Sequence, residues 1–478
     1  MTVKLSLFVI VALPVALRAQ EKFAGTWTGS LITLDTLRMV LHVSQSPDGT
    51  YKASIDCPAQ NMFGLNCDKV EARNSGKDTL LSFSIDKLKV SYTGKMINDT
   101  TLAGNFTQGA TIPLVFYKTF SPQVVKAIRR PQTPKPPFPY RSEEVVYKSP
   151  DQLMQFGGTI TIPQGRGPFP AILLITGSGQ QDRDETIFDH KPFAVIADAL
   201  TKDGFVVLRV DDRGKGNSNG NFVNSTTADF ANDANASIDY LKTRPEVNDK
   251  KVGLLGHSEG GLIATIIGSQ RKDIAFIVLL AAPGVPMIDL MAEQNVAILT
   301  ASGISPATAA QYKILYTEVA NATLNAPDQN VAKQEVITRV NNWIAKNDSS
   351  TVQAVGFRSE EAKQQYANQF VTQVWSPWMK YFMRINPHPY LVNLKKVKVL
   401  ALNGGKDLQV VAQQNLPAIS DALKEGHTKV FETKELIGLN HLFQTCTKCT
   451  LAEYGQLEET IAPVALQTIT DWLNKNAK

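Results

Sequence analysis

Ser258 lies in the sequence LLGHSEGG, residues 254–261, where glycines flank a single serine directly after an apolar run. A G-x-S-x-G pattern carries a nucleophilic serine when a strand leads into it, a sharp turn exposes the hydroxyl and a helix packs closely behind. Residues 252–255 are typical of such a strand, and residues 261–267 of a helix rich in small side chains. The pattern therefore predicts that Ser258 is a nucleophile, against the alternative of a tight structural turn. The N-terminus of the following helix would favour a developing anion there.

A second G-x-S-x-G pattern, GNSNG at residues 216–220, lacks this context. DDRGK precedes it and NFVNSTTAD follows it, so there is no strand before it and no apolar helix behind it. We expect Ser218 to be a loop residue.

A serine hydroxyl becomes nucleophilic when a histidine removes its proton and a carboxylate holds the imidazolium that forms. These partners follow the serine in the order aspartate, histidine when the pattern G-x-S-x-G joins a strand to a helix. Asp407 follows a glycine turn after the apolar run VKVLAL, and His441 follows the final predicted strand. The sequence therefore predicts a catalytic triad of Ser258, Asp407 and His441.

The other candidate histidines are less well placed to act as the base. His427 precedes the final predicted strand and falls at the opposite edge of the sheet, as a surface residue would. His388 lies in a helical region and His190 between a strand and a helix, where either could touch substrate.

A tetrahedral intermediate needs hydrogen-bond donors for its oxyanion. We expect these from the backbone N–H of Glu259, next to the nucleophile, and from that of Ser178 in TGSGQQDRDE. The glycines of this loop permit a close backbone approach, and Gly179 could take the role of Ser178 by a shift of one residue.

The elements that must position these residues are nearly continuous apolar runs, among them FPAILLIT, FVVLRVD, IAFIVLLAAP and VKVLALNGG. Helical segments alternate with them, which predicts a mostly parallel sheet covered by helices on both faces, with ligands at the carboxyl ends of its strands. Residues of about 285–394 break the alternation and predict a helical cap. The aromatic cluster VWSPWMKYFMRINPHPY could line an acyl or leaving-group pocket, or simply pack the cap.

The region before this sheet has a different rhythm. Short alternating segments and turns over residues 20–120 predict a small antiparallel β-barrel or sandwich. Residues 121–141 are rich in proline and predict a semi-rigid linker to a second domain at residues 142–478. The glycine spacing in GTWTGSLI, YTGKM and LAGNFTQGA resembles the lipocalin-like domain of some exported bacterial hydrolases. An accessory role and the binding of an apolar ligand are both compatible with such a domain.

TGSGQQDRDE, DDRGKGNS and GHSEGG together resemble the α/β-hydrolase superfamily, and more narrowly exported bacterial esterases and their serine-peptidase relatives. The resemblance implies an α/β-hydrolase fold over about residues 156–473, with the triad in the expected order. Thr176 stands where many relatives carry histidine before the oxyanion glycine, a departure that affects loop geometry. Asp212 and Arg213 are expected to brace neighbouring loops.

The N-terminus predicts export. Lys4 precedes an apolar stretch over residues 5–17, which a proline interrupts, and Ala19 offers a small residue for cleavage. The apolar stretch is too short to span a bilayer, so we expect a signal peptide at residues 1–19, a periplasmic or secreted protein and no membrane span in the mature chain. The formal charge of +5 falls to +3 without Lys4 and Arg18. So mild a balance gives no reason to expect nucleic acid as a partner.

Four cysteines form two close pairs, Cys57 with Cys67 and Cys446 with Cys449. In an exported chain such pairs are more often disulfides than metal ligands. Zinc at His441 and the second pair would have only three ligands, and a thioredoxin-like role for CTKC lacks its βαβ context. We therefore expect two disulfides and no metal.

The sequence thus predicts a serine carboxylesterase that cleaves a small-molecule ester through an acyl-enzyme, without a cofactor. One alternative is a peptidase that uses Glu259 or Asp184 to bind a substrate amine. Another is a non-catalytic carrier of apolar ligands. The acyl chain, the alcohol and the oligomeric state are left open.

Overall fold

The computed structural model describes residues 22–32, 36–46, 48–57, 62–75, 78–108, 110–119 and 128–478. These residues form two compact units, one ending at Thr119 and the other beginning at Ile128. The predicted signal peptide, residues 1–19, lies outside the described residues, as do residues 121–127 of the predicted linker.

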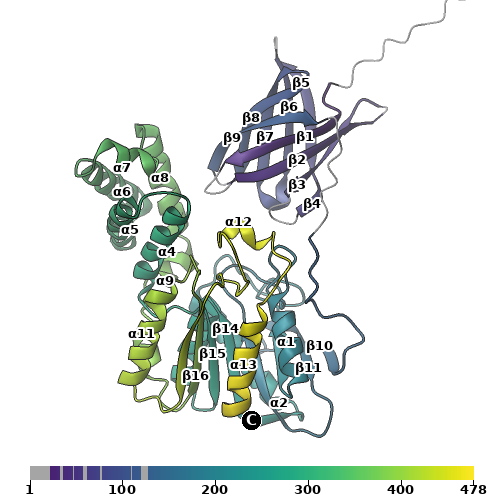
Figure 1. Ribbon diagram of the computed structural model, residues 1–478, viewed down its shortest axis with the longest axis vertical. Coiled ribbons are helices and arrows are strands. Elements are labelled where there is room, and N and C mark those ends of the chain that lie inside the picture. The colour runs from purple at the N-terminus through teal and green to yellow at the C-terminus, as the bar shows by residue number, and fades with distance from the viewer. Residues whose placement is uncertain are drawn as a thin grey trace, which may run out of the picture. The chain divides into compact units, whose positions relative to one another are not determined.

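The N-terminal unit is a single curled antiparallel sheet (Figure 1). Its strands lie side by side in the order β4-β3-β2-β1-β9-β8-β7-β6-β5. The two edge strands, β4 and β5, are separated in the chain by only Cys67 and Asp68, so the sheet must curl to bring its edges together. The strands are β1 (Gly25–Ile32), β2 (Thr36–Gln45), β3 (Tyr51–Cys57), β4 (Met62–Asn66), β5 (Lys69–Ser75), β6 (Asp78–Ile85), β7 (Val90–Asn98), β8 (Thr101–Gln108) and β9 (Ala110–Thr119), with the 3-10 helix η2 (Asp86–Leu88) before β7.

Large side chains fill the inside of this curled sheet. Trp27, Leu41, Ile55, Tyr92 and Phe116 are all buried, and they come from strands spread across the sheet. A small barrel whose interior is occupied by its own side chains is the usual outcome for a sheet of this size. The predicted all-β, barrel-like domain is confirmed.

The second unit is built on a mixed sheet with the strand order β10-β11-β13-β12-β14-β15-β16-β17. β11 pairs antiparallel with β10 on one side and with β13 on the other. The strands β13, β12, β14, β15, β16 and β17 pair in parallel in that order. The strands are β10 (Arg141–Lys148), β11 (Gln155–Ile162), β12 (Phe169–Ile175), β13 (Val206–Val210), β14 (Val247–His257), β15 (Phe276–Leu280), β16 (Lys398–Gly404) and β17 (Phe431–Leu436).

Helices cover both faces of this sheet because successive residues of its strands point to opposite sides. In β12, Ile172 and Leu174 join the core formed with α1 and α13, whereas Ala171 and Leu173 join the core formed with α2 and α11. The helices on the faces are α1 (Pro192–Lys202), α2 (Thr227–Thr243), α3 (Glu259–Gln270), α11 (Ala412–Glu425) and α13 (Pro463–Asn476). The predicted mostly parallel sheet covered by helices is confirmed.

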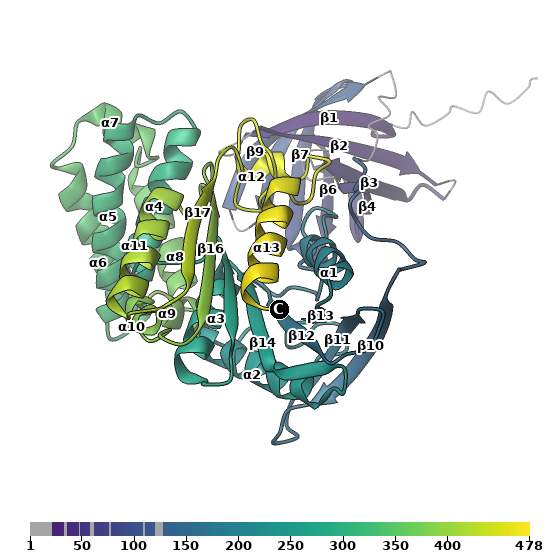
Figure 2. The same ribbon diagram turned by 60° about the horizontal axis from the view of Figure 1, so that its bottom comes forward.

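A helical insertion separates β15 from β16 in the chain. Figures 1 and 2 show most of its helices gathered in one bundle to one side of the sheet. The helices are α4 (Met287–Ala301), α5 (Pro306–Asn325), α6 (Gln329–Ile344), α7 (Ser349–Ala354), α8 (Glu360–Val374), α9 (Pro377–Phe382) and α10 (His388–Val392), and α12 (Leu451–Tyr454) follows much later. None of the described helices has the length and apolar character needed to cross a membrane.

Candidate active site

Ser258 occupies the turn between β14 and α3. Its φ of 53° lies in the left-handed region, which is strained for a residue with a side chain. The turn requires glycine on both sides, since a Cβ at Gly256 would lie 2.1 Å from the Gly260 carbonyl oxygen. A Cβ at Gly260 would lie 2.1 Å from the carbonyl oxygen of Ile175, at the end of β12. The two glycines therefore let the strand and helix meet tightly around a half-buried serine.

Ser218, in the second G-x-S-x-G pattern, has a structural role. It is buried, and its hydroxyl donates to the Asp211 carbonyl oxygen at 2.8 Å and accepts from the Gly157 N–H at 2.9 Å. The hydroxyl thus uses both its donor and its acceptor capacity to hold a loop.

His441 and Asp407 form a buried pair at the carboxyl ends of the strands. His441 Nδ1 lies 2.7 Å from Asp407 Oδ2, and their side chains are 6% and 0% exposed. The other carboxylate oxygen accepts the backbone N–H groups of Gln409 and Val410 at 2.8 and 2.9 Å. The carboxylate is therefore held in place by the turn that follows β16, and it orients the imidazole.

Ser178 and Glu259, the predicted oxyanion residues, are joined through their side chains. Ser178 Oγ donates to Glu259 Oε2 at 2.9 Å. Glu259 Oε1 accepts from Thr227 Oγ1 at 2.7 Å and from Trp378 Nε1 at 2.9 Å. Burial raises the pKa of Glu259, and these hydrogen bonds oppose the rise. The carboxyl group thus connects the loop after β12, the start of α2 and helix α9 of the insertion.

Asp212 and Arg213 brace the loops around Ser178, as expected. Asp212 accepts from Thr176 Oγ1 at 2.8 Å and from the Gln181 N–H at 2.6 Å. Burial raises the pKa of Asp212 to about 7. Arg213 makes two hydrogen bonds to the carboxylate of Asp233, at 2.7 and 2.8 Å. Thr176 therefore supports the loop through its hydrogen bond to Asp212.

A second imidazole–carboxylate pair, not anticipated from the sequence, lies beside the first. His257 Nδ1 is 3.0 Å from Glu185 Oε1, and the same oxygen accepts the Gly177 N–H at 2.6 Å. His257 Nε2 is 3.1 Å from the carbonyl oxygen of His441, and the two rings lie 4.7 Å apart between centroids. The available signal was a titratable residue at the buried end of an apolar strand, where it must have a partner.

The remaining candidate histidines lie outside this arrangement. His190 is buried and is bonded to Thr460 Oγ1 at 2.9 Å and to the Tyr454 carbonyl oxygen at 3.0 Å. Burial lowers the pKa of His190 to about 4. His388 is exposed and pairs with Glu425 at 3.0 Å.

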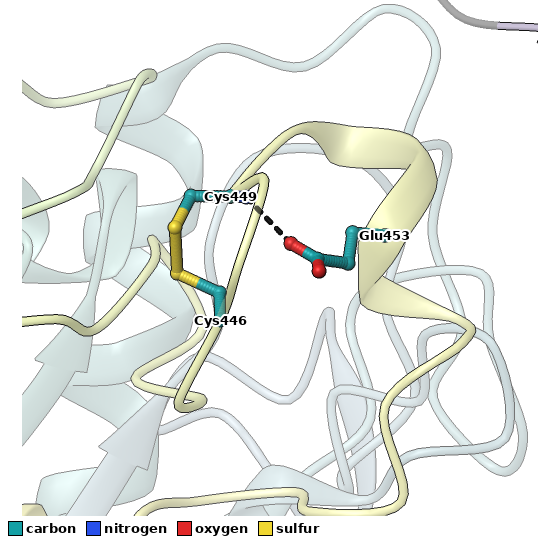
Figure 3. Close-up of side chains that lie close together, drawn as sticks. All are labelled: Cys446, Cys449 and Glu453. Atoms are coloured by element: carbon teal, nitrogen blue, oxygen red, sulfur yellow. Dashed lines mark hydrogen bonds between the residues drawn. A yellow bond between two sulfur atoms is a disulfide. The ribbon is translucent and has the colours of Figure 1, made fainter.

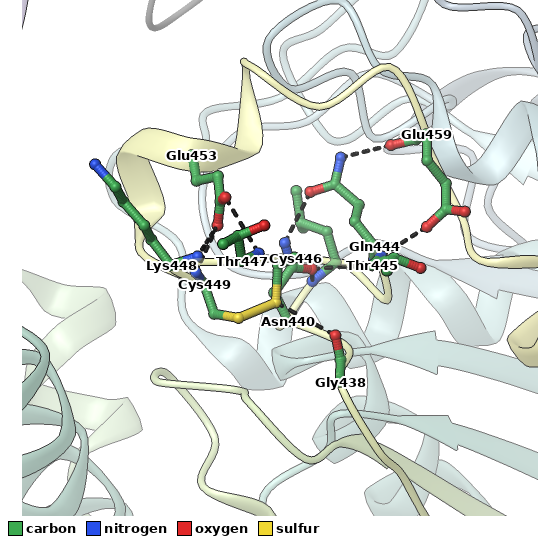
Figure 4. Close-up of a disulfide and its surroundings, with 11 residues drawn as sticks. Gly438, Asn440, Gln444, Thr445, Cys446, Thr447, Lys448, Cys449, Glu453 and Glu459 are labelled. Atoms are coloured by element: carbon green, nitrogen blue, oxygen red, sulfur yellow. Dashed lines mark hydrogen bonds between the residues drawn. A yellow bond between two sulfur atoms is a disulfide. The ribbon is translucent and has the colours of Figure 1, made fainter.

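The disulfide predicted for Cys446 and Cys449 is present, and it lies in the loop that follows His441 (Figures 3 and 4). Glu453, from α12, accepts the backbone N–H groups of Lys448 at 2.9 Å and of Cys449 at 2.5 Å. Cys446 Sγ lies 3.4 Å from the Gly438 carbonyl oxygen. With the sulfurs bonded to each other and this carboxylate occupied by N–H donors, the group does not offer a zinc site.

The disulfide predicted between Cys57 and Cys67 is wrong: Cys67 is described and carries a free thiol. Cys57 pairs with Met62 in the ladder, whereas the Cys67 N–H bonds to the Ala53 carbonyl oxygen. Four residues of strand, about 13 Å, separate these positions, and a disulfide requires Cα atoms within about 7 Å. Burial raises the pKa of the Cys67 thiol to about 11.

Two acidic groups considered for binding a substrate amine are already engaged. The Glu259 carboxylate accepts from three donors, as described above. Asp184 forms ion pairs with Arg209 and with Lys191, the latter at 3.2 Å.

The comparison with protein families finds a match within the second unit. Residues 190–414 match the family model described as serine aminopeptidase, S33, over a stretch that contains Ser258 and Asp407 and ends before His441. This stretch lies within the mixed sheet and its helices. The second unit has the fold of the α/β-hydrolases, a mostly parallel sheet covered by helices on both faces. In this domain the strained serine follows β14, and the aspartate and histidine follow β16 and β17.

Among curated proteins, the chain is similar to esterase EstD of Thermotoga maritima, with 36% identity over 137 residues. The match covers 29% of this chain and about a third, 32%, of that protein. Among solved structures, an esterase of Pyrococcus furiosus aligns with 71% of this chain and 92% of its own, at 15% identity and a TM-score of 0.40. A structure of Est1E from Butyrivibrio proteoclasticus with ferulic acid bound aligns with 70% and 98%, at 16% identity and a TM-score of 0.40.

Proposed function

We propose that this chain is a serine hydrolase that cleaves carboxylic esters through an acyl-enzyme on Ser258. The observation that carries the proposal is the buried hydrogen bond of 2.7 Å between His441 and Asp407. It lies at the carboxyl ends of the strands, where Ser258 occupies a strained turn. The similarity to an esterase over part of the chain supports the same reaction class.

In the proposed reaction, Ser258 Oγ attacks the ester carbonyl carbon while His441 Nε2 takes the hydroxyl proton. The tetrahedral intermediate collapses, the alcohol leaves with the proton from His441, and the acyl group stays on Ser258. Water then attacks the acyl-enzyme with His441 again as base, which releases the carboxylic acid. Asp407 keeps the imidazole oriented and stabilises its positive charge throughout.

Within the described residues, no hydrogen bond joins Ser258 Oγ to His441. This catalytic hydrogen bond is often long in a free enzyme and shortens when substrate binds.

The oxyanion would be bound by the backbone N–H groups of Ser178 and Glu259. No hydrogen bond among the described residues uses either of these groups, so both are available. The N–H of Glu259 is the first of α3 and has no acceptor within its own helix.

An aminopeptidase would need a carboxylate to hold the substrate amine, and the family model's description makes this the second candidate. Glu259 and Asp184 both already bind other donors within the chain, which favours ester hydrolysis over aminopeptidase activity. We also propose that the protein is exported, periplasmic or secreted, on the basis of residues 1–19 alone, and that it acts on a small-molecule ester.

The experiment that tests the proposal is hydrolysis of p-nitrophenyl acetate, butyrate and octanoate, with an amino-acid p-nitroanilide in parallel. The chain beginning at residue 20 is compared with Ser258→Ala and with Ser218→Ala as the matched control. We expect ester turnover that is lost in Ser258→Ala and kept in Ser218→Ala. Anilide cleavage would move the assignment to a peptidase, and turnover that survives in Ser258→Ala would overturn it.

A further inference from the structure

His257, the residue before the nucleophile, is enclosed on both sides by hydrogen-bond acceptors. Its Nδ1 faces the Glu185 carboxylate at 3.0 Å, and its Nε2 faces the backbone carbonyl oxygen of His441 at 3.1 Å. The side chains of His257 and Glu185 are only 9% and 6% exposed, so water does not replace either partner.

These two contacts set the number of protons on the ring. A backbone carbonyl oxygen has no proton to donate, so Nε2 must carry the proton of that bond. A carboxylate is likewise an acceptor, so Nδ1 must carry a proton as well. An imidazole with protons on both nitrogens is an imidazolium.

The shared proton of the pair belongs on the imidazole and not on the carboxyl group. The ordinary pKa of glutamic acid is about 4.3 and that of histidine about 6.5, so the histidine holds the proton more tightly. Glu185 Oε1 also faces the Gly177 N–H at 2.6 Å, so the geometry has this oxygen as the acceptor of two N–H donors.

The Glu185 carboxylate is the dominant charge around the His257 ring. Besides Glu185, the titratable groups near the ring are His441, in ring contact, and Asp407, whose charge acts on it through space. Apolar side chains from α1, from β15 and from the loop after β17 line the other side: Phe193, Leu280 and Phe443. Burial alone lowers the pKa of His257, but the charge and hydrogen bond of Glu185 outweigh it and raise the pKa.

We propose that His257 is a buried imidazolium which, with Glu185, ties the loop carrying His441 to the loop carrying the oxyanion donor. The chain of bonds runs from the His441 carbonyl through His257 and Glu185 to the Gly177 N–H. Because His257 is bonded directly to Ser258 in the chain, the link also fixes the nucleophile between the two loops. His257 and Glu185 are therefore positioning residues, and their effect on turnover rests on the proposed ester hydrolysis.

Replacing the carboxylate by an amide breaks this link in a defined way. In Glu185→Gln the imidazole loses the charge that holds its second proton, so it keeps a single N–H. That N–H can donate to the His441 carbonyl or to the glutamine oxygen, but not to both. If the glutamine instead turns its NH₂ toward Nδ1, the Gly177 N–H loses its acceptor, because the same atom faces both groups, so one bond of the chain is lost in either case. A displacement of about 1 Å between catalytic groups can cost on the order of 100-fold in rate. We expect a loss of this order in kcat, with a smaller change in KM.

The first arm of the test needs no substrate. Histidine-labelled protein is studied by two-dimensional ¹⁵N–¹H NMR, and His257 is assigned by His257→Gln or, if that variant does not fold, by replacing the other five of the six histidines one at a time. At pH 7 we expect protons on both ring nitrogens of His257 in the wild type and on one in Glu185→Gln. A singly protonated His257 in the wild type at pH 7 would overturn the proposal.

The second arm is the pH profile of p-nitrophenyl butyrate hydrolysis. We expect activity to decline as pH rises through the pKa of His257, and to decline from a lower pH in Glu185→Gln. Glu425→Gln is the matched control, since it removes the carboxylate of the exposed His388–Glu425 pair and should leave the profile unchanged.

Superimposable profiles for wild type and Glu185→Gln would refute the positioning role. Because the NMR arm does not depend on turnover, it separates failure of this inference from failure of the esterase proposal.

Discussion

The two neighbours of Ser258 are both buried and both titratable, but their charges are satisfied in opposite ways. On one side, His257 lies between a carboxylate and a carbonyl oxygen and pairs its charge with Glu185. On the other side, the Glu259 carboxyl group accepts from three neutral donors, and no cationic side chain pairs with it among the described residues.

The two neighbours also hold the same loop from two directions. His257 reaches Gly177 through Glu185, and Glu259 reaches the next residue, Ser178, through its side chain. His257 is also hydrogen-bonded to the loop that carries His441, and Glu259 is also hydrogen-bonded to helix α9 of the insertion. The residues flanking the nucleophile thus connect it to three separate segments, and the His257 side should depend more strongly on charge.

The largest effect is expected at the pair of His441 and Asp407, whose loop is bonded to the His257 side of this comparison. Asp407→Asn preserves the size of the side chain but replaces the oxygen that receives the imidazole N–H, so the wrong tautomer of His441 is favoured. We expect kcat to fall on the order of 10⁴-fold in p-nitrophenyl butyrate hydrolysis with the fold retained. Asp289→Asn, in α4 of the insertion, is the control. A loss of less than tenfold in Asp407→Asn would argue against the triad.

On the Glu259 side, Trp378→Phe removes the donor from the insertion and leaves the buried carboxyl group with one hydrogen bond fewer. A lost partner of this kind costs about 1–3 kcal/mol of unfolding free energy. Urea unfolding measures this cost, with Trp375→Phe as the control, since the Trp375 indole packs against Lys380. Equal destabilisation by the two substitutions would show that the bond to Glu259 contributes nothing specific.

Glu259→Gln separates the charge of this group from its hydrogen bonds. The amide oxygen can keep the bonds from Thr227 and Trp378, and its NH₂ can donate to Ser178 Oγ. Since the pKa of Glu259 is raised by burial, wild-type stability falls as pH rises from about 4.5 through that pKa, because the folded state holds the proton longer.

We therefore expect Glu259→Gln to lose less stability than wild type between pH 5 and pH 8 in urea unfolding. Its loss of kcat/KM should also be smaller than that of Glu185→Gln. A greater loss of activity than in Glu185→Gln would reverse the comparison.

The smallest effect is expected from Ser178→Ala. The substitution removes one neutral donor to Glu259 and keeps the backbone N–H proposed for the oxyanion. We expect a cost of about 1 kcal/mol in stability and less than a tenfold change in kcat, measured by urea unfolding and ester turnover. A loss near 10³-fold in kcat would mean that the hydroxyl itself binds the oxyanion.

Much of the fold followed from the sequence because local patterns carry it. Apolar runs between helical segments predicted the parallel sheet, and the glycines around Ser258 predicted its turn, since both depend on residues close in the chain. The proximity of Asp407 and His441 could be predicted because the carboxyl ends of parallel strands lie on the same side of the sheet.

The structure added what depends on contacts distant in sequence. The link between Glu185 and His257 spans 72 residues, and that between Glu259 and Trp378 spans 119. The predicted Cys57–Cys67 bond failed for a related reason. Proximity in sequence suggested a bridge, but the register of β3 and β4 holds the two cysteines about 13 Å apart along the strands.

The most direct test that Ser258 is a nucleophile is its covalent capture by a fluorophosphonate, followed by intact-mass and peptide mass spectrometry. We expect one phosphonyl group per chain, on the peptide that contains Ser258, at a rate that drops sharply in His441→Ala. Ser258→Ala should take up no label. Labelling at another serine, or equal labelling of Ser258→Ala, would contradict a nucleophilic Ser258.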